Sequence, residues 1–209
     1  MIKSISYKQD DIFDGITTMF CPDGFECDPT YSKGIFYKNI PKPKYKYDLS
    51  PQTEDTIQAD SCNLPLEDNL IKSIMFDPPF CFGIHGKTLQ NISAKRFTMY
   101  KNFEELENHY KGSLLEFKRI LIKKGILVFK CQDYTDSKTT MTHCLVWKWA
   151  TDLGFYAKDL FILLNESRIW NPNLTQRHAR KCHSYFWVFE NINTKRRALN
   201  EKQNDGGVE

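Results

Sequence analysis

Three features that are common in membrane, secreted and metal-binding proteins are missing from this sequence. Its 209 residues contain no apolar run of the roughly 20 residues that a membrane-spanning helix requires. Its seven cysteines form no CxxC pair and are odd in number, which argues against a zinc site and against a complete set of disulfides. The N-terminal stretch MIKSISYKQDDIFDG is polar and acidic where a signal peptide would be apolar. We therefore expect a soluble, cytoplasmic protein with reduced cysteines, no membrane association and no metal ion.

A strong charge imbalance is also missing. The 29 basic and 26 acidic residues leave a net charge of +3, which is too small to identify a polyanionic partner from composition alone. There is no internal repeat, and 41% of the residues are hydrophobic, which suffices for one buried core in a chain of this length. We expect one domain over residues 1–193. Residues 194–209 are polar and lack aromatic side chains, so we expect a disordered tail there.

Hydrophobic periodicity predicts alternating strands and helices. Apolar residues recur at helical spacing in residues 12–20, 102–121 and 140–153, for which Asp10 or Asp11, Gly125 and Gly154 are the expected cap and stop signals. A further helix is expected to start after residue 34. Strands are expected at residues 24–28, 42–48, 55–60, 71–77, 125–133, 156–164 and 183–191.

This alternation predicts an α/β fold with a mostly parallel, doubly wound sheet. The segment between the last two strands has no helical pattern, so we expect those two strands to form a C-terminal antiparallel hairpin.

The first four predicted strands share one property, which is that each ends on an aspartate. Ligands of open α/β sheets bind outside the carboxyl ends of the strands, so these carboxylates are candidates for one site. In the stretch IMFDPPFCFG, two prolines that cannot donate to a sheet ladder directly follow the last of these aspartates and end its strand. The four residues are Asp28, Asp48, Asp60 and Asp77.

The spacing of the first three aspartates favours a ligand that contains a nucleoside. After Asp28, Gly34 permits a tight turn whose backbone amides could face a ligand, although Ser32 stands where a dinucleotide fingerprint has glycine. Asp48 closes the next strand about twenty residues later, where such folds place the carboxylate that binds ribose hydroxyls. Asp60 is positioned to accept a hydrogen bond from the exocyclic amine of adenine. As an alternative, Asp60 caps the turn-like segment DSCNLP.

Four segments, taken in order, resemble the motifs of the S-adenosylmethionine-dependent amino-methyltransferases, the family that methylates adenine N6 or cytosine N4. The segments are DPTYSKGIF, YDLSP, QADSCNLPLEDNLIKSIMFDPPF and LLEFKRILIKKGILVFKCQD. Within them, DPPF matches the family's catalytic Asp/Asn/Ser-Pro-Pro-aromatic tetrad. The similarity covers about residues 25–190 and departs from the family at Ser32, where the cofactor loop usually has glycine. It implies a class I methyltransferase fold of Rossmann-like type, with S-adenosyl-L-methionine as the cofactor.

The resemblance also implies roles for individual residues. An aromatic amine is a weak nucleophile, so its site must accept both N–H hydrogens; Asp77 supplies a charged acceptor and the carbonyl of Pro78 a second one. Phe80 offers a stacking face to a base that has flipped out of its helix. The implied catalytic residues are Asp77, Pro78, Pro79 and Phe80, and the implied cofactor-binding residues are Asp28, Thr30, Tyr31, Gly34, Phe36, Asp48, Asp60 and Ser61.

Two basic segments are candidate nucleic-acid contacts. The segment HGKTLQNISAKRFTMYK directly follows the tetrad, has no acidic residue and resembles a mobile loop beside the target base. The segment RIWNPNLTQRHARKCH is also free of acidic residues and includes an aromatic residue, Trp170. A solvated connection is the alternative for both. The expected substrate contacts are Lys87, Lys95, Arg96, Arg177, Arg180 and Lys181.

Two histidines of the second segment, His178 and His183, could suggest a metal site. The segment offers no carboxylate as a further ligand, so a phosphate contact or simple packing is the better interpretation.

Together these features predict an adenine N6-methyltransferase that acts on nucleic acid after base flipping, with DNA favoured over RNA. Aspartate before Pro-Pro favours adenine, because the cytosine enzymes of the family more often have serine there. Two alternatives remain, an enzyme that acts on RNA or on cytosine N4, and an inactive nucleic-acid-binding subunit with the same fold. With 209 residues there is no room for a separate recognition domain. A protein partner or a second copy of the chain could therefore contribute to target recognition.

Overall fold

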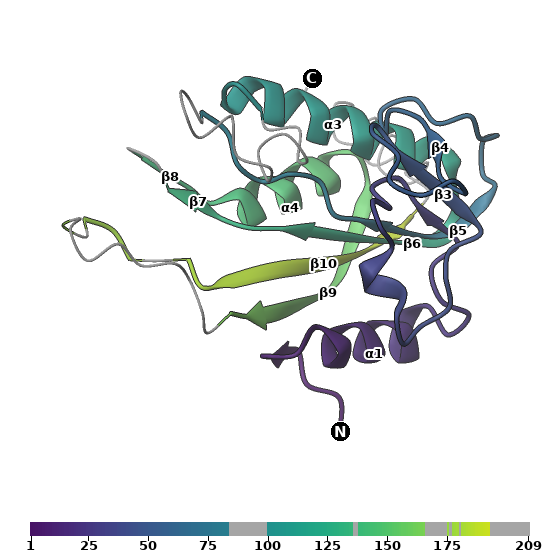
Figure 1. Cartoon of the computed structure of the whole chain (residues 1–209), viewed down its shortest axis with the longest axis horizontal. Helices are drawn as coiled ribbons and strands as arrows, with labels where there is room; N and C mark the ends of the chain where they lie inside the picture. The colour runs from purple at the N-terminus through teal and green to yellow at the C-terminus, as the bar shows by residue number, and fades with distance from the viewer. Residues whose placement is uncertain (84–99, 136–137, 166–174, 176, 180, 193–209) are drawn as a thin grey trace, which may run out of the picture.

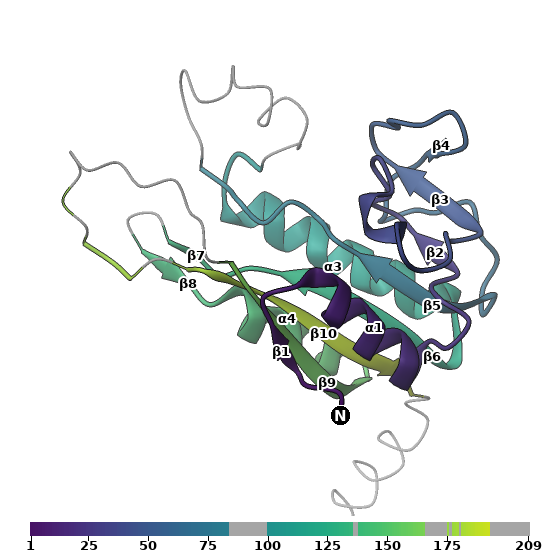
Figure 2. The same cartoon turned by 60° about the horizontal axis from the view of Figure 1, so that its bottom comes forward.

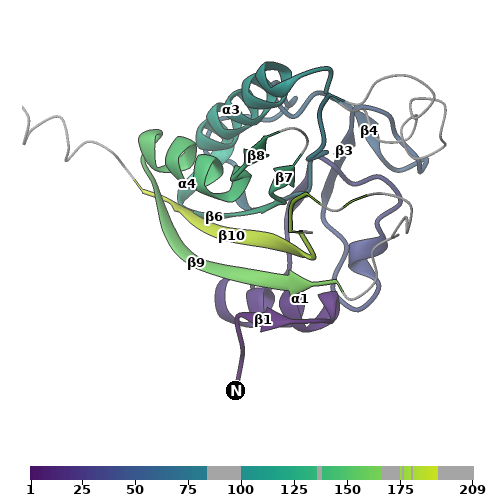
Figure 3. The same ribbon diagram turned by 90° about the vertical axis from the view of Figure 1, so that its left-hand side faces the viewer.

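The computed structural model describes residues 1–83, 100–135, 138–165, 175, 177–179 and 181–192. These segments form a central sheet with helices on both faces. Helix α1 (Gln9–Phe20) lies on one face, and α3 (Phe103–Ile120) and α4 (Thr142–Asp152) lie on the other, as Figures 1 and 3 show. This layering is what a doubly wound α/β fold predicts.

The strands of the main sheet lie in the order β1-β9-β10-β6-β5-β2-β3-β4. Every neighbouring pair is parallel except the two that involve β10, which runs antiparallel to both β9 and β6. The fold class predicted from the sequence, a class I methyltransferase type with a mostly parallel sheet and a C-terminal antiparallel hairpin, is therefore confirmed. The strands are β1 (Ile5–Ser6), β2 (Cys27–Asp28), β3 (Tyr45–Asp48), β4 (Ile57–Gln58), β5 (Ile71–Phe76), β6 (Leu121–Cys131), β9 (Phe155–Leu164) and β10 (His183–Asn191), and a separate small hairpin consists of β7 (Tyr134–Thr135) and β8 (Thr139–Thr140).

The central strands β5 and β6 are buried on both faces because helices cover both sides of the sheet. Phe76 and Phe129 belong to the core cluster shared with α3 and α4, whereas Met75 and Val128 belong to the cluster shared with α1. The rings of Phe76 and Phe129 meet edge to face with their centroids 4.9 Å apart. Burial on both faces explains why these strands read as continuous apolar runs in the sequence and not as alternating patterns.

The predicted cap of the first helix is wrong. Helix α1 begins at Gln9, and its N-cap residue is Lys8, whose side chain makes no capping hydrogen bond. Asp10 and Asp11 instead lie in the first helical turn, where negative charge interacts favourably with the helix dipole.

Of the two predicted glycine stops, one is confirmed and one is wrong. Gly154 follows α4 with a φ of 81°, the left-handed conformation typical of a helix end. Gly125 lies inside β6, because α3 ends at Ile120 and the chain passes directly into the strand. Leu121 already pairs with Ile71 of β5, so the helix has ended before the glycine. The register of β6 against β5 then shifts between Leu121 and Ile126, the segment that contains Gly125.

The chain between β2 and β5 contains little helix. The helix expected after residue 34 amounts to the short 3-10 helix η1 (Ile35–Tyr37). Pro41 and Pro43 follow shortly afterwards and cannot donate backbone hydrogen bonds to a longer helix. In Figure 2, β2, β3 and β4 lie together at one end of the sheet, away from β9. Their connecting loops are therefore available to form the walls of a site.

The core cluster between the sheet and α3 predicts that alanine substitution will affect stability very differently at two positions of α3. Phe117 is fully buried, whereas Leu115 is 60% exposed. We expect Phe117→Ala to lower the free energy of unfolding by about 3–5 kcal/mol, because it removes buried area and leaves a cavity. Leu115→Ala should change it by no more than about 0.5 kcal/mol. Urea unfolding of both variants measures the difference, and similar values for the two would contradict this description of the core.

Candidate functional site

A pocket of about 360 Å³ lies at the carboxyl ends of β2, β3, β4 and β5. Its volume falls in the range of small-molecule sites. Three side chains from outside the chain between β2 and the DPPF segment also line it, namely Tyr100, His109 and Lys130. Among the residues expected to bind cofactor or to be catalytic, those that line the pocket are Thr30, Tyr31, Phe36, Asp48, Asp60, Ser61, Asp77 and Pro79, whereas Asp28, Gly34, Pro78 and Phe80 do not.

Asp28 is buried beneath the pocket and holds its first loop in place. One carboxylate oxygen accepts hydrogen bonds from the backbone N of Thr30 at 2.8 Å and from its Oγ1 at 3.0 Å. The other oxygen accepts from the Tyr37 hydroxyl at 2.7 Å. Burial raises the pKa of Asp28 to about 7, although the hydrogen bonds from Tyr37 and Thr30 lower it. Asp28 was expected to contact the cofactor, but it does not line the pocket. Its carboxylate instead fixes the conformation of the loop that does.

Thr30 links this loop to the DPPF segment. Its hydroxyl donates to Asp28 and accepts a hydrogen bond from the backbone N of Asp77 at 2.9 Å. Because a hydroxyl can donate and accept at once, one side chain fixes the ends of β2 and β5 relative to each other.

The turn after Thr30 depends on two residues with positive φ. Gly34 has a φ of 64°, and a Cβ placed there would overlap the ring of Tyr31, so the predicted tight turn does require glycine. Ser32 has a φ of 51°, which is a conformation that glycine adopts at lower cost. The serine that departs from the family pattern therefore keeps the glycine-like backbone of the loop.

Asp48 joins the first loop to the end of β3. One of its carboxylate oxygens accepts from the backbone N of Ser32 at 2.9 Å, and the other accepts from the backbone N of Ser50 at 2.8 Å. Asp48 is partly exposed and lines the pocket. Each oxygen retains a second lone pair, so the carboxylate can still accept hydrogen bonds from a ligand.

The interpretation of Asp60 as a turn cap is confirmed, and the residue also lines the pocket. Its carboxylate accepts from the backbone N of Cys62 at 2.9 Å. Ser61 beside it is buried and is hydrogen-bonded to His109 Nε2 at 2.8 Å, while Tyr100 is hydrogen-bonded to His109 Nδ1 at 2.6 Å. Burial lowers the pKa of His109, so the imidazole is neutral at pH 7.

The same corner contains a group of potential metal ligands. The ligand atoms of Asp60, Cys62 and His109 lie within 4.8 Å of one another. Both ring nitrogens of His109 are already hydrogen-bonded, and burial raises the pKa of the Cys62 thiol to about 11. A metal ion would have to displace Ser61 from His109 and a proton from Cys62, so the group fits a metal poorly.

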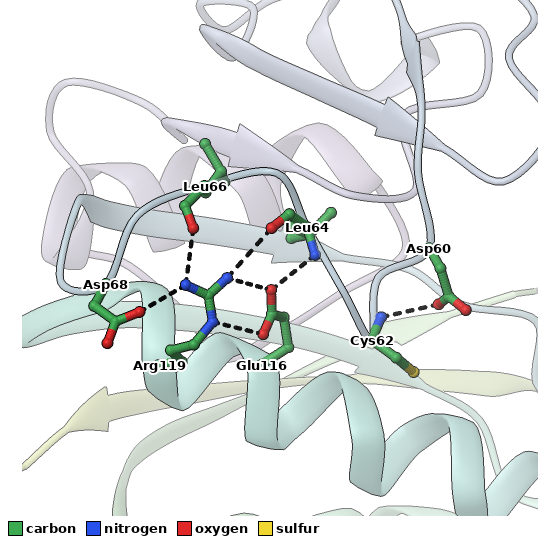
Figure 4. Close-up of polar contacts among 7 residues, drawn as sticks. All are labelled: Asp60, Cys62, Leu64, Leu66, Asp68, Glu116 and Arg119. Carbon is green, nitrogen blue, oxygen red and sulfur yellow. Dashed lines mark hydrogen bonds and ion pairs between the residues drawn. The ribbon is translucent and has the colours of Figure 1, made fainter.

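An arginine on α3 fixes the segment that follows Asp60 (Figure 4). Arg119 donates to the carbonyl oxygens of Leu66 at 2.8 Å and Leu64 at 3.3 Å, and to the carboxylates of Asp68 and Glu116 at 2.7 and 2.6 Å. Glu116 in turn accepts from the backbone N of Leu64 at 2.7 Å. The planar guanidinium satisfies backbone groups that no strand or helix uses, and so holds this wall of the pocket against α3.

Asp77 is paired with a lysine from the neighbouring strand. Lys130 Nζ lies 3.1 Å from Asp77 Oδ2, and the two side chains are only 14% and 22% exposed. The ammonium also lies 4.9 Å from the ring centroid of Phe36 and 5.6 Å from that of Phe186. Pairing and partial burial hold the Asp77 carboxylate in one orientation, with Oδ2 occupied.

The two prolines and the phenylalanine of DPPF lie in different surroundings. Pro78 is buried, and Pro79 lines the pocket while its carbonyl accepts from the Tyr110 hydroxyl at 2.8 Å. Phe80 is partly exposed and lies outside the pocket lining.

Most of the expected nucleic-acid contacts lie outside the described residues. Residues 84–99 include Lys87, Lys95 and Arg96, and Arg180 is likewise not described. The predicted disordered tail, residues 194–209, also falls there. Arg177 is described and exposed, and Lys181 is partly buried, with its carbonyl accepting from Gln132 Nε2 at 3.1 Å.

Sequence reasoning missed the site residues that come from β6 and α3. Lys130 carried a weak signal, because it is the one charged residue in the otherwise apolar run GILVFKC. His109 and Tyr110 lie in an ordinary amphipathic helix, and nothing in the local pattern separates them from core residues.

No protein-family model matches the chain, and a search of curated proteins finds no match. Solved structures with a similar fold include the [4+2]-cyclase SpnF, with a TM-score of 0.54 and 11% identity over 88% of this chain and 80% of that one. A provisionally assigned hemolysin from Lactococcus lactis has a TM-score of 0.51 and 14% identity over 91% of this chain and 94% of that one. These likenesses show the fold alone.

A further structure with partial similarity is a provisionally assigned DNA modification methylase from Thermus thermophilus, complexed with S-adenosyl-L-methionine. Its TM-score is 0.47 and its identity 14%, over 72% of this chain. The chain spans only 61% of that protein's length. In a separate observation, none of the helices that the structure describes has the length and hydropathy of a membrane-spanning segment.

The buried Asp28 predicts a specific pH dependence of stability. Its pKa is about 7 in the folded protein against an ordinary value of 3.8, so between these pH values the folded chain retains a proton that the unfolded chain has released. The contribution of this carboxyl to stability is therefore complete below about pH 4 and is lost as the pH rises to about 7. Asp28→Asn stays neutral and should lack this slope.

The measurement is urea unfolding of both proteins between about pH 4 and 8. We expect the free energy of unfolding of the wild type, relative to Asp28→Asn, to fall with pH and then level off. The exposed Asp23, changed to Asn, is the control and should leave the pH dependence as it is in the wild type. Parallel curves for the wild type and Asp28→Asn would contradict a raised pKa at Asp28.

Proposed function

We propose that this chain is an S-adenosyl-L-methionine-dependent methyltransferase that methylates the N6 amine of adenine in nucleic acid, with DNA favoured over RNA. One observation carries the proposal. The carboxylate of the DPPF tetrad, Asp77, and the carboxylate expected to bind the ribose, Asp48, line the same pocket at the carboxyl edge of the sheet. The resemblance of the sequence to the amino-methyltransferases supplies the reaction, and the pocket supplies the room for donor and amine to meet.

The residues of the pocket fit the proposed cofactor. Asp48 would accept hydrogen bonds from the ribose hydroxyls, and Asp60 from the adenine amine. Ile35, Phe36 and Leu49 supply apolar wall area for the purine. The cofactor provides a sulfonium methyl group that is already electrophilic, so the protein's task is positioning.

The charges of the pocket also fit a cationic donor. Its described lining contains the carboxylates of Asp48, Asp60 and Asp77, and one ammonium group, that of Lys130. The balance is negative, which favours a sulfonium cation over a neutral thioether. The same difference would help the demethylated product to leave.

Asp77 is the proposed acceptor for the target amine. Lys130 occupies Oδ2, and within the described residues Oδ1 makes no hydrogen bond, so Oδ1 can accept one N–H of the amine. We assign the second acceptor to the carbonyl of Pro78, with Pro79 shaping the turn, and the stacking face for the flipped base to Phe80. Two acceptors favour the pyramidal nitrogen, whose lone pair can attack the methyl group. Lys130 and Tyr110 act as positioning residues, because they hold the carboxylate and the Pro79 carbonyl from two other elements.

Further residues are assigned to nucleic-acid binding. Lys87, Lys95, Arg96, Arg177, Arg180 and Lys181 would contact the nucleic-acid backbone, and target recognition would involve a protein partner or a second copy of the chain. A cytoplasmic setting, which the odd number and the spacing of the cysteines favour, is part of the same proposal. Residues 1–193 would form the methyltransferase domain and residues 194–209 a tail.

The experiment that tests the proposal is a product analysis. The protein is incubated with S-adenosyl-L-methionine and with single-stranded or duplex DNA or RNA, and the nucleic acid is digested to nucleosides for mass spectrometry. We expect N6-methyldeoxyadenosine. N4-methylcytosine or a methylated ribonucleoside would move the assignment to the corresponding alternative, and absence of any product together with absence of cofactor binding would identify an inactive subunit.

Asp77→Ala should abolish methyl transfer, because the carboxylate acts on the amine. Retention of more than about a tenth of the wild-type rate, equivalent to less than about 1.4 kcal/mol of barrier, would remove Asp77 from the catalytic role. Asp23→Ala, an exposed change of the same charge, is the control. The variant leaves the Lys130 ammonium without its partner, so cofactor binding should be measured with S-adenosylhomocysteine, whose sulfur is neutral. We expect the dissociation constant of this ligand from the variant to be close to the wild-type value.

Asp48→Ala should weaken S-adenosylhomocysteine binding by about 1.5–3 kcal/mol, because charge-assisted hydrogen bonds to the ribose are lost. Isothermal calorimetry gives the dissociation constants. Glu54→Ala removes an exposed carboxylate from the adjacent connection and serves as the matched control for net charge. An unchanged dissociation constant for Asp48→Ala would place the ribose acceptor elsewhere.

A further inference from the structure

A second group of reactive side chains lies outside the pocket, at the start of α4. Asp133, which follows β6, is 5% exposed, and its Oδ1 accepts from His143 Nδ1 at 2.7 Å and from the His143 backbone N at 3.2 Å. His143 Nε2 lies 3.3 Å from the Sγ of Cys144. A carboxylate, an imidazole and a thiol are therefore connected in series.

The carboxylate determines which nitrogen of His143 carries the proton. An ionised Asp133 can only accept, so Nδ1 must donate to it. In the neutral ring, Nε2 is then without a proton and faces the thiol as an acceptor. The Cys144 S–H thus points its proton toward a base that a third group orients, which is the arrangement that activates nucleophiles.

The imidazole is held rigidly from the other side. Its ring stacks on Tyr185 of β10 at a centroid distance of 4.2 Å and an interplanar angle of 18°. Trp187 Nε1 donates to the His143 carbonyl at 2.9 Å. Among the described residues, Tyr185 and Cys131 also interact with Asp133 and Cys144, and His183 Nε2 is hydrogen-bonded to the Tyr185 hydroxyl at 2.8 Å.

Cys144 differs from the other cysteines in its exposure. It is exposed and lies in the first turn of α4, where the helix dipole favours negative charge. Cys21, Cys27 and Cys131 are buried, and burial raises the pKa of each of these thiols. An oriented base, an exposed sulfur and a helix N-terminus thus coincide at Cys144.

We infer that Asp133, His143 and Cys144 form an activated thiol site whose ligand class is a low-molecular-weight disulfide. The Sγ proton moves to His143 Nε2, and Asp133 stabilises the resulting imidazolium. The thiolate attacks one sulfur of the disulfide, so that a new S–S bond forms to Cys144 while the original S–S bond breaks. The second half of the disulfide leaves as a thiolate and takes the proton from His143. No oxidant other than the disulfide itself is consumed.

The test compares the same cysteine in two states of the full chain. Native and urea-unfolded protein are treated with iodoacetamide at pH 6.5, and the alkylation rate of each cysteine is read by mass spectrometry of its peptide. We expect native Cys144 to react at least about tenfold faster than unfolded Cys144, because His143 Nε2 lies beside the sulfur and can accept its proton. A cysteine that is merely exposed reacts no faster when folded. A native rate equal to or below the unfolded rate would overturn the inference.

Variants then distinguish the effect of the base, His143, from the effect of the exposed position of the Cys144 sulfur. His143→Gln should reduce the native rate to within about twofold of the unfolded rate, and Asp133→Asn should also lower it, because the imidazole loses the carboxylate that orients it. Oxidised glutathione should form a mixed disulfide at Cys144 in the wild type and none at this peptide in Cys144→Ser. Native-state rates that are the same in the wild type and in folded His143→Gln, as judged by circular dichroism, would also overturn the inference.

Discussion

The interaction on which the rest of the site depends is the buried carboxylate of Asp28. Its oxygens accept hydrogen bonds from Thr30 and Tyr37, and the Thr30 hydroxyl in turn accepts a hydrogen bond from the backbone N of Asp77. One buried acid thus sets the relative position of the ends of β2 and β5. The two residues in contact, Thr30 and Asp77, are 47 residues apart in the sequence. Burying a carboxylate is costly unless its hydrogen bonds are made, and here three donors satisfy it.

Around that constraint, each wall of the pocket is held by a different element. Arg119 of α3 binds the segment after Asp60, Lys130 of β6 orients Asp77, and Tyr110 of α3 binds the carbonyl of Pro79. The loops between β2 and β5 contain little regular structure, so these side-chain contacts replace the backbone ladders that would otherwise fix them. Such a site is preorganised by its supporting residues, as positioning chemistry requires.

Local signals predicted much of this arrangement, and long-range contacts account for what was missed. The aspartates at strand ends were recognisable because prolines, turn residues and apolar runs mark where strands stop. Lys130 and Tyr110 reach the site from 53 and 31 residues away, and no local pattern records such contacts. The stop assigned to Gly125 was wrong for a related reason, because strand pairing at Leu121 ends α3 before the glycine is reached.

The most direct test of the central claim is a crystal structure of the protein with S-adenosylhomocysteine. The account predicts that the ligand lies in the pocket between the loops after β2 and β5, with its ribose hydroxyls within hydrogen-bonding distance of the Asp48 carboxylate and its sulfur facing Asp77. A ligand bound elsewhere, or a pocket that stays empty at saturating ligand concentration, would contradict the account.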